Sequence, residues 1–81
     1  HSVYLSRVFR EKRGITILEY ITYVRMEKAK ELLRETNDTV SGIAAATGYV
    51  SSNTFNRIFK KTTGVSPSIY RKNTQEFKNE Q

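Results

Sequence analysis

The sequence contains no cysteine and only one histidine, which is residue 1. Disulfide bridges and thiolate metal sites are therefore excluded, and histidine is too scarce for a catalytic triad or a histidine metal cluster. No run of apolar residues approaches the roughly 20 that a transmembrane helix needs. We therefore expect no metal, no cofactor and no membrane partner. An 81-residue chain with these absences is typical of one small binding domain of the cytoplasm.

Acidic residues are also missing from one long stretch of the chain. Residues 39–75 hold five Lys or Arg and no Asp or Glu. A second basic block, residues 1–14, is separated from it by residues 15–38, in which the charges nearly balance. The whole chain has a formal net charge of +6. Such an excess favours a polyanionic partner, and nucleic acid is the first to consider.

The chain is similar to itself when it is shifted by 50 residues. The shared pattern is Arg, an aliphatic residue, Phe and a basic residue, followed by Gly, an aliphatic–hydroxyl pair and Tyr. In this register Ser2, Arg7, Phe9, Gly14 and Tyr20 correspond to Ser52, Arg57, Phe59, Gly64 and Tyr70. Two copies of one structural unit would produce such a pattern.

The first half of the chain predicts two helices. Leu5, Val8 and Phe9 have the spacing of an amphipathic helix that ends near Gly14. Thr16 and Glu19 have the spacing of a capping box, which predicts a second helix to about residue 35. The apolar residues expected on one side of this helix are Tyr20, Ile21, Val24, Ala29, Leu32 and Leu33.

The second half predicts three shorter helices. Thr39 is the expected N-cap of a helix to Ala46, Ser51 or Ser52 caps a helix to about Thr62, and Ser66-Pro67 starts the last one. No segment shows the alternation of a strand, so the predicted fold class is all-α. The expected parts are a recognition helix in 1–14, a linker helix and turn in 15–38, a helix-turn-helix with a closing helix in 39–72, and a polar, fraying tail in 73–81.

Residues 39–62 have the pattern of a helix-turn-helix unit. Ala44 is small enough for a close helix crossing, and Gly48 tolerates the dihedral angles of a tight turn. Phe55, Ile58 and Phe59 form the expected apolar side of the second helix. Its other side carries Ser52, Asn53, Asn56, Arg57 and Lys60. These side chains suit base edges and phosphates in a DNA major groove, although an ordinary polar surface helix would also carry them.

The first copy is expected to act in the same way through Val3, Ser6, Arg7 and Arg10. The middle helix would be about 27 Å long at 1.5 Å per residue, close to the roughly 34 Å between successive major-groove segments on one face of DNA. One chain could thus present two recognition helices to two half-sites. Arg25 on this helix would contact phosphates between them or would pair with a neighbouring Glu.

Several stretches together resemble the DNA-binding domain of AraC/XylS-family bacterial transcription regulators. They are Tyr4-Leu5-Ser6-Arg7-Val8-Phe9, Gly14-Ile15-Thr16, Tyr20, Arg25, Ala29-Lys30-Glu31-Leu32-Leu33, Ile43-Ala44, Gly48-Tyr49, Phe55-Asn56-Arg57-Ile58-Phe59-Lys60-Lys61, Gly64-Val65-Ser66-Pro67 and Tyr70-Arg71. The resemblance covers residues 1–72. It implies two helix-turn-helix units joined by a long helix and sequence-specific binding of double-stranded DNA.

The resemblance also implies roles for single residues. Base contacts map to Val3, Ser6, Arg7, Ser52, Asn53, Asn56 and Arg57, and phosphate contacts to Arg10, Lys60 and Lys61. Tyr49 stands where Phe is commoner in the family, Val50 where a polar residue is frequent, and Gly42 where a helix former is usual. The resemblance implies two more helices before residue 1, a separate sensing or receiver domain, and possible contact with RNA polymerase.

Two other classes of function compete with DNA binding. A helical protein-interaction module, without base-specific readout, is the main alternative. An enzyme is not expected, because no candidate nucleophile has a base to activate it. Glu27, Glu31 and Glu35 lie at i, i+4 spacing among Lys28, Lys30 and Arg34, which is typical of a solvated helix face with ion pairs.

Overall fold

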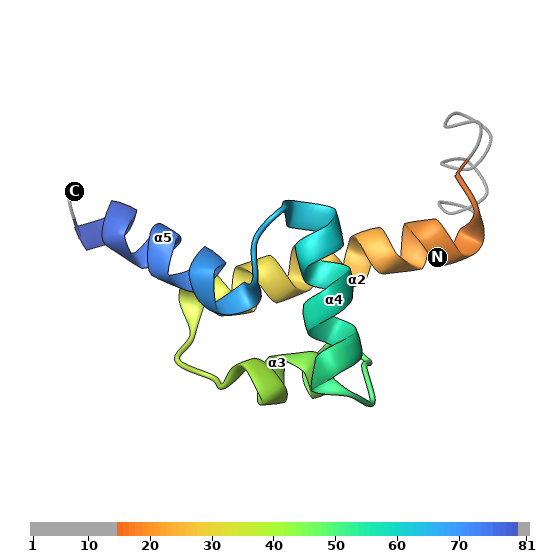
Figure 1. Ribbon diagram of the computed structural model, residues 1–81, viewed down its shortest axis with the longest axis horizontal. Helices are drawn as coiled ribbons and strands as arrows, with labels where there is room; N and C mark the ends of the chain where they lie inside the picture. Colours follow the sequence, from red (N-terminus) through yellow and green to blue (C-terminus); the bar gives the residue numbers. More distant parts are fainter. Residues whose placement is uncertain (1–14, 80–81) are drawn as a thin grey trace.

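The computed structural model of the chain describes residues 15–79, and this part is built from four helices without a strand. They are α2 (Ile17–Glu35), α3 (Val40–Ala46), α4 (Ser52–Thr63) and α5 (Pro67–Asn79). In Figure 1 the long helix α2 runs across the molecule, α4 crosses it, and α3 and α5 lie beside its later turns. The all-α prediction is confirmed for the described residues, while the helix expected in residues 1–14 lies outside them.

Each of the first three helices begins at the hydroxyl residue that the sequence predicted. Thr16, Thr39 and Ser51 are the N-caps, and each side-chain oxygen accepts a backbone N–H of the first turn. Ser51, not Ser52, therefore caps α4. The capping box at Thr16 forms only in part. The Glu19 N–H donates to the Thr16 hydroxyl at 3.0 Å, but the Glu19 carboxylate accepts from that same hydroxyl at 3.3 Å and not from the main chain.

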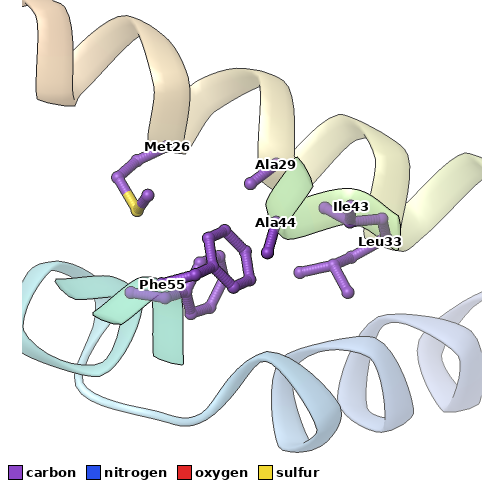
Figure 2. Packing of buried hydrophobic residues seen from close by; sticks show 7 residues of the cluster. Met26, Ala29, Leu33, Ile43, Ala44 and Phe55 are labelled. Atoms are coloured by element: carbon purple, nitrogen blue, oxygen red, sulfur yellow. The ribbon is translucent and has the colours of Figure 1, made fainter. Parts of the chain in front are cut away.

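Seven buried apolar side chains form the core between α2, α3 and α4 (Figure 2). They are Met26, Ala29, Leu33, Ile43, Ala44, Phe55 and Phe59. The side chains of Phe55 and Phe59 are fully buried, as expected for the inner side of α4. Tyr70 of α5 packs against this core from the other side and closes it.

The apolar side predicted for α2 is wrong in its first half. Ile21 and Val24 are 38% and 47% exposed, whereas Met26, which was not on the predicted side, is buried. The reason is the helical period of 3.6 residues, which sets Val24 and Met26 on nearly opposite sides. The helix carries two apolar stripes. One, Met26, Ala29 and Leu33, faces the core, and the other, Ile17, Ile21 and Val24, is exposed on the turns that project beyond α4 in Figure 1.

Helix α5 is longer than predicted. It continues to Asn79, beyond residue 73, where a fraying polar tail was expected. No Gly or Pro follows Pro67, so nothing in the sequence stops the helix. The hydroxyl of Thr74 also donates to the carbonyl of Tyr70, one turn earlier, which satisfies a polar side chain along the helix.

Candidate nucleic-acid interface

The turn between α3 and α4 is held by its own backbone. Gly48 has a φ of 95°, a left-handed conformation that favours glycine. The N–H groups of Gly48 and Tyr49 donate to the carbonyls of Ala45 and Ala44 at 3.1 and 2.9 Å. The buried hydroxyl of Thr47 donates to the carbonyl of Ile43 at 2.8 Å. The turn therefore has little freedom, and it fixes where α4 begins.

The crossing of α3 and α4 has the small residue and the apolar anchors predicted for it. Ala44 is 1% exposed, and Phe55 packs above it from α4. A hydrogen bond of 2.9 Å joins the hydroxyls of Ser41 and Ser52, so the first turn of α4 is also tied to α3 by polar atoms. These contacts give the two helices the arrangement of a helix-turn-helix unit.

The outer side of α4 carries a stripe of polar and basic side chains. All of its members are exposed, and they lie opposite the buried rings of Phe55 and Phe59. The stripe consists of Asn53, Asn56, Arg57, Lys60 and Lys61. Ser52, which was predicted with them, lies at the edge of the stripe, is half-buried, and shares its hydroxyl with Ser41. The structure thus brings five of the predicted residues of α4 together on one open face.

Arg25 lies against the turn that leads to α4. Its guanidinium carbon is 5.3 Å from the centre of the Tyr49 ring, which is cation–π distance. A Cβ atom added at Gly48 would be 3.2 Å from the same carbon, so the guanidinium occupies the space beside the glycine. In the described part of the chain Arg25 makes no ion pair, while Glu27 and Glu31 pair with Lys30 and Lys28. The predicted pairing of Arg25 with a Glu is therefore not formed.

Sequence reasoning missed Tyr49 as the partner of Arg25. The only signal in the sequence was that an aromatic residue follows Gly48, and this does not tell which side chain of another helix contacts the ring. The ring of Tyr49 begins a row of aromatic contacts. Tyr49–Phe55, Phe55–Phe59 and Phe59–Tyr70 have ring centres 5.7, 5.8 and 5.5 Å apart.

Helix α2 contacts this row of rings at both of its ends. Arg25 covers Tyr49 at one end, and Arg34 donates a hydrogen bond of 3.0 Å to the Tyr70 hydroxyl at the other. The hydrogen bond to Tyr70 raises the pKa of Arg34 above its usual value. Arg25 thereby joins α2 to the turn before α4, and Arg34 joins α2 to α5.

The other predicted site residues lie outside the described part of the chain. They are Val3, Ser6, Arg7 and Arg10. Within the described part of the chain, Arg57 and Lys61 line a groove of about 540 Å³ together with Leu18 and Tyr23 of α2. The first turns of α2 and the later turns of α4 therefore share one open surface.

The tight glycine turn, the close helix crossing and the exposed basic stripe of α4 define a helix-turn-helix DNA-binding domain. The sequence profile of a family described as a helix-turn-helix domain matches residues 1–73. The chain belongs to this family, whose members are AraC-type transcription regulators.

Named relatives and a solved structure agree with this assignment. The chain is 40% identical over 72 residues to YisR, an uncharacterized helix-turn-helix-type transcriptional regulator of Bacillus subtilis. It is 38% identical over 68 residues to AdaA of the same organism, a bifunctional transcriptional activator and DNA repair enzyme. These matches cover 89% and 84% of this chain but only 25% and 32% of the relatives.

The solved structure is the C-terminal domain of the response regulator yesN from Fusobacterium nucleatum. It has a TM-score of 0.72 and 39% sequence identity, over 88% of this chain and 69% of that one. In residues 15–79 no helix is long and apolar enough to cross a membrane. The same residues contain no cluster of three metal-ligating side chains.

Proposed function

We propose that this chain binds double-stranded DNA in a sequence-specific manner and that α4 is a recognition helix in the major groove. The observation that carries the proposal is the exposed stripe of α4, because amides and cations stand there opposite a fully buried aromatic side. Residues 39–75 contain no carboxylate that would repel phosphates. Recognition helices of this class read bases with their first turns.

The stripe divides into base-reading and phosphate-binding positions. Asn53 and Asn56 have the amide groups that pair with adenine, and Arg57 has the planar fork that pairs with guanine. Ser52 at the edge has a hydroxyl with further hydrogen-bonding capacity beyond its bond to Ser41. Lys60 and Lys61, in the last turn of α4, and Arg25, beside the turn, are the proposed phosphate contacts.

A second recognition helix completes the proposal. We place it in residues 1–14, with Val3, Ser6 and Arg7 toward bases and Arg10 toward phosphate. The exposed stripe of Ile17, Ile21 and Val24 on α2 supports this, since a first helix-turn-helix unit packed there would bury it. With 19 residues, α2 is about 28 Å long, which suits two units in neighbouring groove segments.

Selection of bound duplexes from a random pool tests the proposal. We expect two short sequence motifs about one helical turn apart, and an affinity that falls with rising salt. Enrichment of a single motif would contradict the proposal of a second recognition helix. If no sequence is enriched and binding does not depend on salt, the helical protein-interaction module replaces DNA readout as the function of this chain.

Two neighbouring cations of α4 separate base readout from phosphate binding. We expect Arg57→Ala to cost about 1–3 kcal/mol on the selected site and to relax the preference at one base pair. Lys61→Ala, also an exposed cation on the same helix, weakens all duplexes alike and lowers the salt slope by about one. Binding curves at several salt concentrations measure both. Equal losses on every sequence for both variants would overturn the base-reading role of Arg57.

We also propose that the complete protein has parts beyond this chain. The chain spans about a quarter to a third of the two curated relatives described above. A sensing or receiver domain fits this difference in length, and the solved neighbour is itself the C-terminal domain of a response regulator. In this proposal the chain contributes DNA binding without catalysis, and contact with RNA polymerase is a further function of its surface.

A further inference from the structure

Val50 is the most exposed large apolar residue in residues 15–75. Its relative exposure is 106%, so no part of the described protein covers it. The other large exposed apolar side chains in residues 15–75 lie on α2 and, in the case of Ile69, on α5. Val50 therefore does not belong to the apolar stripe of α2, and its exposure calls for a separate cause.

The residues on both sides of Val50 are held by hydrogen bonds and ring contacts. The Tyr49 N–H donates to the Ala44 carbonyl at 2.9 Å, and the Tyr49 ring is held by Phe55 and Arg25. Ser51, the next residue, accepts hydrogen bonds from the N–H groups of Asn53 and Thr54 as the N-cap of α4. Val50 is thus presented at the N-terminal end of the recognition helix by two fixed neighbours, and its β-branched side chain has little rotamer freedom to lose.

We propose that Val50 contacts the C5-methyl group of a thymine beside the bases that α4 reads. This proposal rests on the DNA binding proposed above. The thymine methyl is the apolar feature of the major groove, and apolar side chains recognise it by contact. The N-terminal end of a recognition helix is the part that approaches base edges.

The surroundings of Val50 favour DNA over a protein partner. The apolar centre of a protein interface is a patch of several side chains. Among the exposed large apolar side chains of residues 15–75, Val50 is the only one between α2 and Ile69, and it lies in a stretch with five cations and no acid. A single valine of this kind matches a single methyl group among phosphates.

Replacement of thymine by deoxyuridine tests the contact, because it removes only the methyl group. The full-length protein is first used to select its preferred duplex, and each thymine of that duplex is then replaced in turn. Affinities are measured for the wild type, Val50→Ser, Val50→Thr and the control Ile69→Ser, whose exposed aliphatic residue lies on α5. Circular dichroism melting checks that each variant is folded.

We expect one thymine whose replacement weakens the wild type about fourfold, the value of one methyl group removed from water. For Val50→Ser the ratio of thymine to deoxyuridine affinity falls to about one, and Val50→Thr, which keeps one methyl, lies between. Ile69→Ser keeps the wild-type ratio.

Three results would overturn the contact. The first is a Val50→Ser variant that keeps the wild-type ratio of thymine to deoxyuridine affinity. The second is a Val50→Ser variant that loses the same affinity on all duplexes, which would mean contact with the sugar–phosphate backbone. The third is an unchanged DNA affinity of Val50→Ser together with weaker transcription from a promoter that carries the selected site, measured in a separate assay, which would assign Val50 to a protein partner. If the wild type shows no sequence preference in the selection step, the proposed sequence-specific binding fails and the Val50 contact fails with it. If a preferred duplex is selected, the later steps test the Val50 contact alone.

Discussion

At the scale of single residues, three residues decide how the turn before α4 is built. Gly48 adopts its left-handed conformation, Tyr49 turns its ring inward, and Arg25 reaches across from α2 to cover both. Each of these residues depends on the others for its place. The turn is therefore a contact between two distant segments as well as a local chain reversal.

The glycine at position 48 is required for two reasons that a pair of variants separates. Gly48 and Gly64 have φ values of 95° and 89°, so alanine is strained at both. We expect Gly64→Ala to cost about 1–2 kcal/mol of unfolding free energy from this strain alone, since nothing lies within 4 Å of its added Cβ. Gly48→Ala also displaces the guanidinium of Arg25 and costs about 0.5–1 kcal/mol more.

Urea unfolding measures this difference, and an Arg25→Ala background is its control. The extra cost of Gly48→Ala should vanish there, because no guanidinium is left to displace. An extra cost that survives in this background would show that Arg25 does not determine the need for glycine.

The hydroxyl of Tyr49 is the one buried side-chain polar atom without a hydrogen bond in the described part of the chain. A buried donor without a partner destabilises the folded state. We expect Tyr49→Phe to raise the unfolding free energy by about 1 kcal/mol, since the ring keeps its contacts with Phe55 and Arg25. Denaturant unfolding followed by circular dichroism measures the change, and a loss of stability would point to a partner for this hydroxyl in solution.

At the scale of helices, α5 holds the end of α2. The Arg71 guanidinium donates to the carbonyls of Leu33 and Thr36 at 3.1 and 3.2 Å, and Tyr70 accepts from Arg34. The last carbonyls of a helix have no partner within it, and Arg71 supplies one from another element. Most signals for helix starts were local and predictable, whereas this docking joins residues more than 30 positions apart.

Two adjacent cations of α5 test this docking. Arg71 is half-buried in its bonds to α2, and Lys72 is exposed. We expect Arg71→Ala to lower the unfolding free energy by about 1–2 kcal/mol, because charged hydrogen bonds to two carbonyls are lost. Lys72→Ala removes the same charge and changes stability by less than about 0.5 kcal/mol. Thermal unfolding of both variants measures the two changes in stability. Equal losses of stability would mean that the removed charge, and not the docking of α5 on α2, is responsible for the effect of Arg71→Ala.

At the scale of the whole molecule, the two ends of α2 have different surroundings. Its later turns complete the core around Phe55 and Phe59, while its first turns expose Ile17, Ile21 and Val24. The basic stripe of α4 lies on the side of that helix that faces away from the core. The described part of the molecule is therefore well packed along the later turns of α2, and it leaves apolar side chains exposed on the first turns.

Leucines on the two parts of α2 should differ sharply in importance. Leu33 is fully buried, and Leu33→Ala is expected to cost about 2–5 kcal/mol. Leu18 is 71% exposed, and Leu18→Ala should change the stability of this chain by less than about 0.5 kcal/mol. Chemical unfolding of both variants provides the comparison. A large loss for Leu18→Ala would show that its surface is covered in solution.

Features that depend on near neighbours along the chain could be predicted from the amino-acid sequence. The caps at Thr16 and Thr39, a serine cap at residue 51 or 52, the glycine turn and the outer stripe of α4 follow from spacing and side-chain type. These signals act within one or two helical turns, so no knowledge of distant contacts was needed to predict them.

Which of several similar residues contact each other depends on how the helices pack. Met26 is buried and Val24 is exposed because the core shared with α3 and α4 lies on one side of α2. Arg25 lies on Tyr49 instead of pairing with a Glu, since the turn passes within its reach. Ser52 shares its hydroxyl with Ser41 for the same reason. Each of these outcomes depends on the distance between segments far apart in the sequence, which residue spacing does not contain.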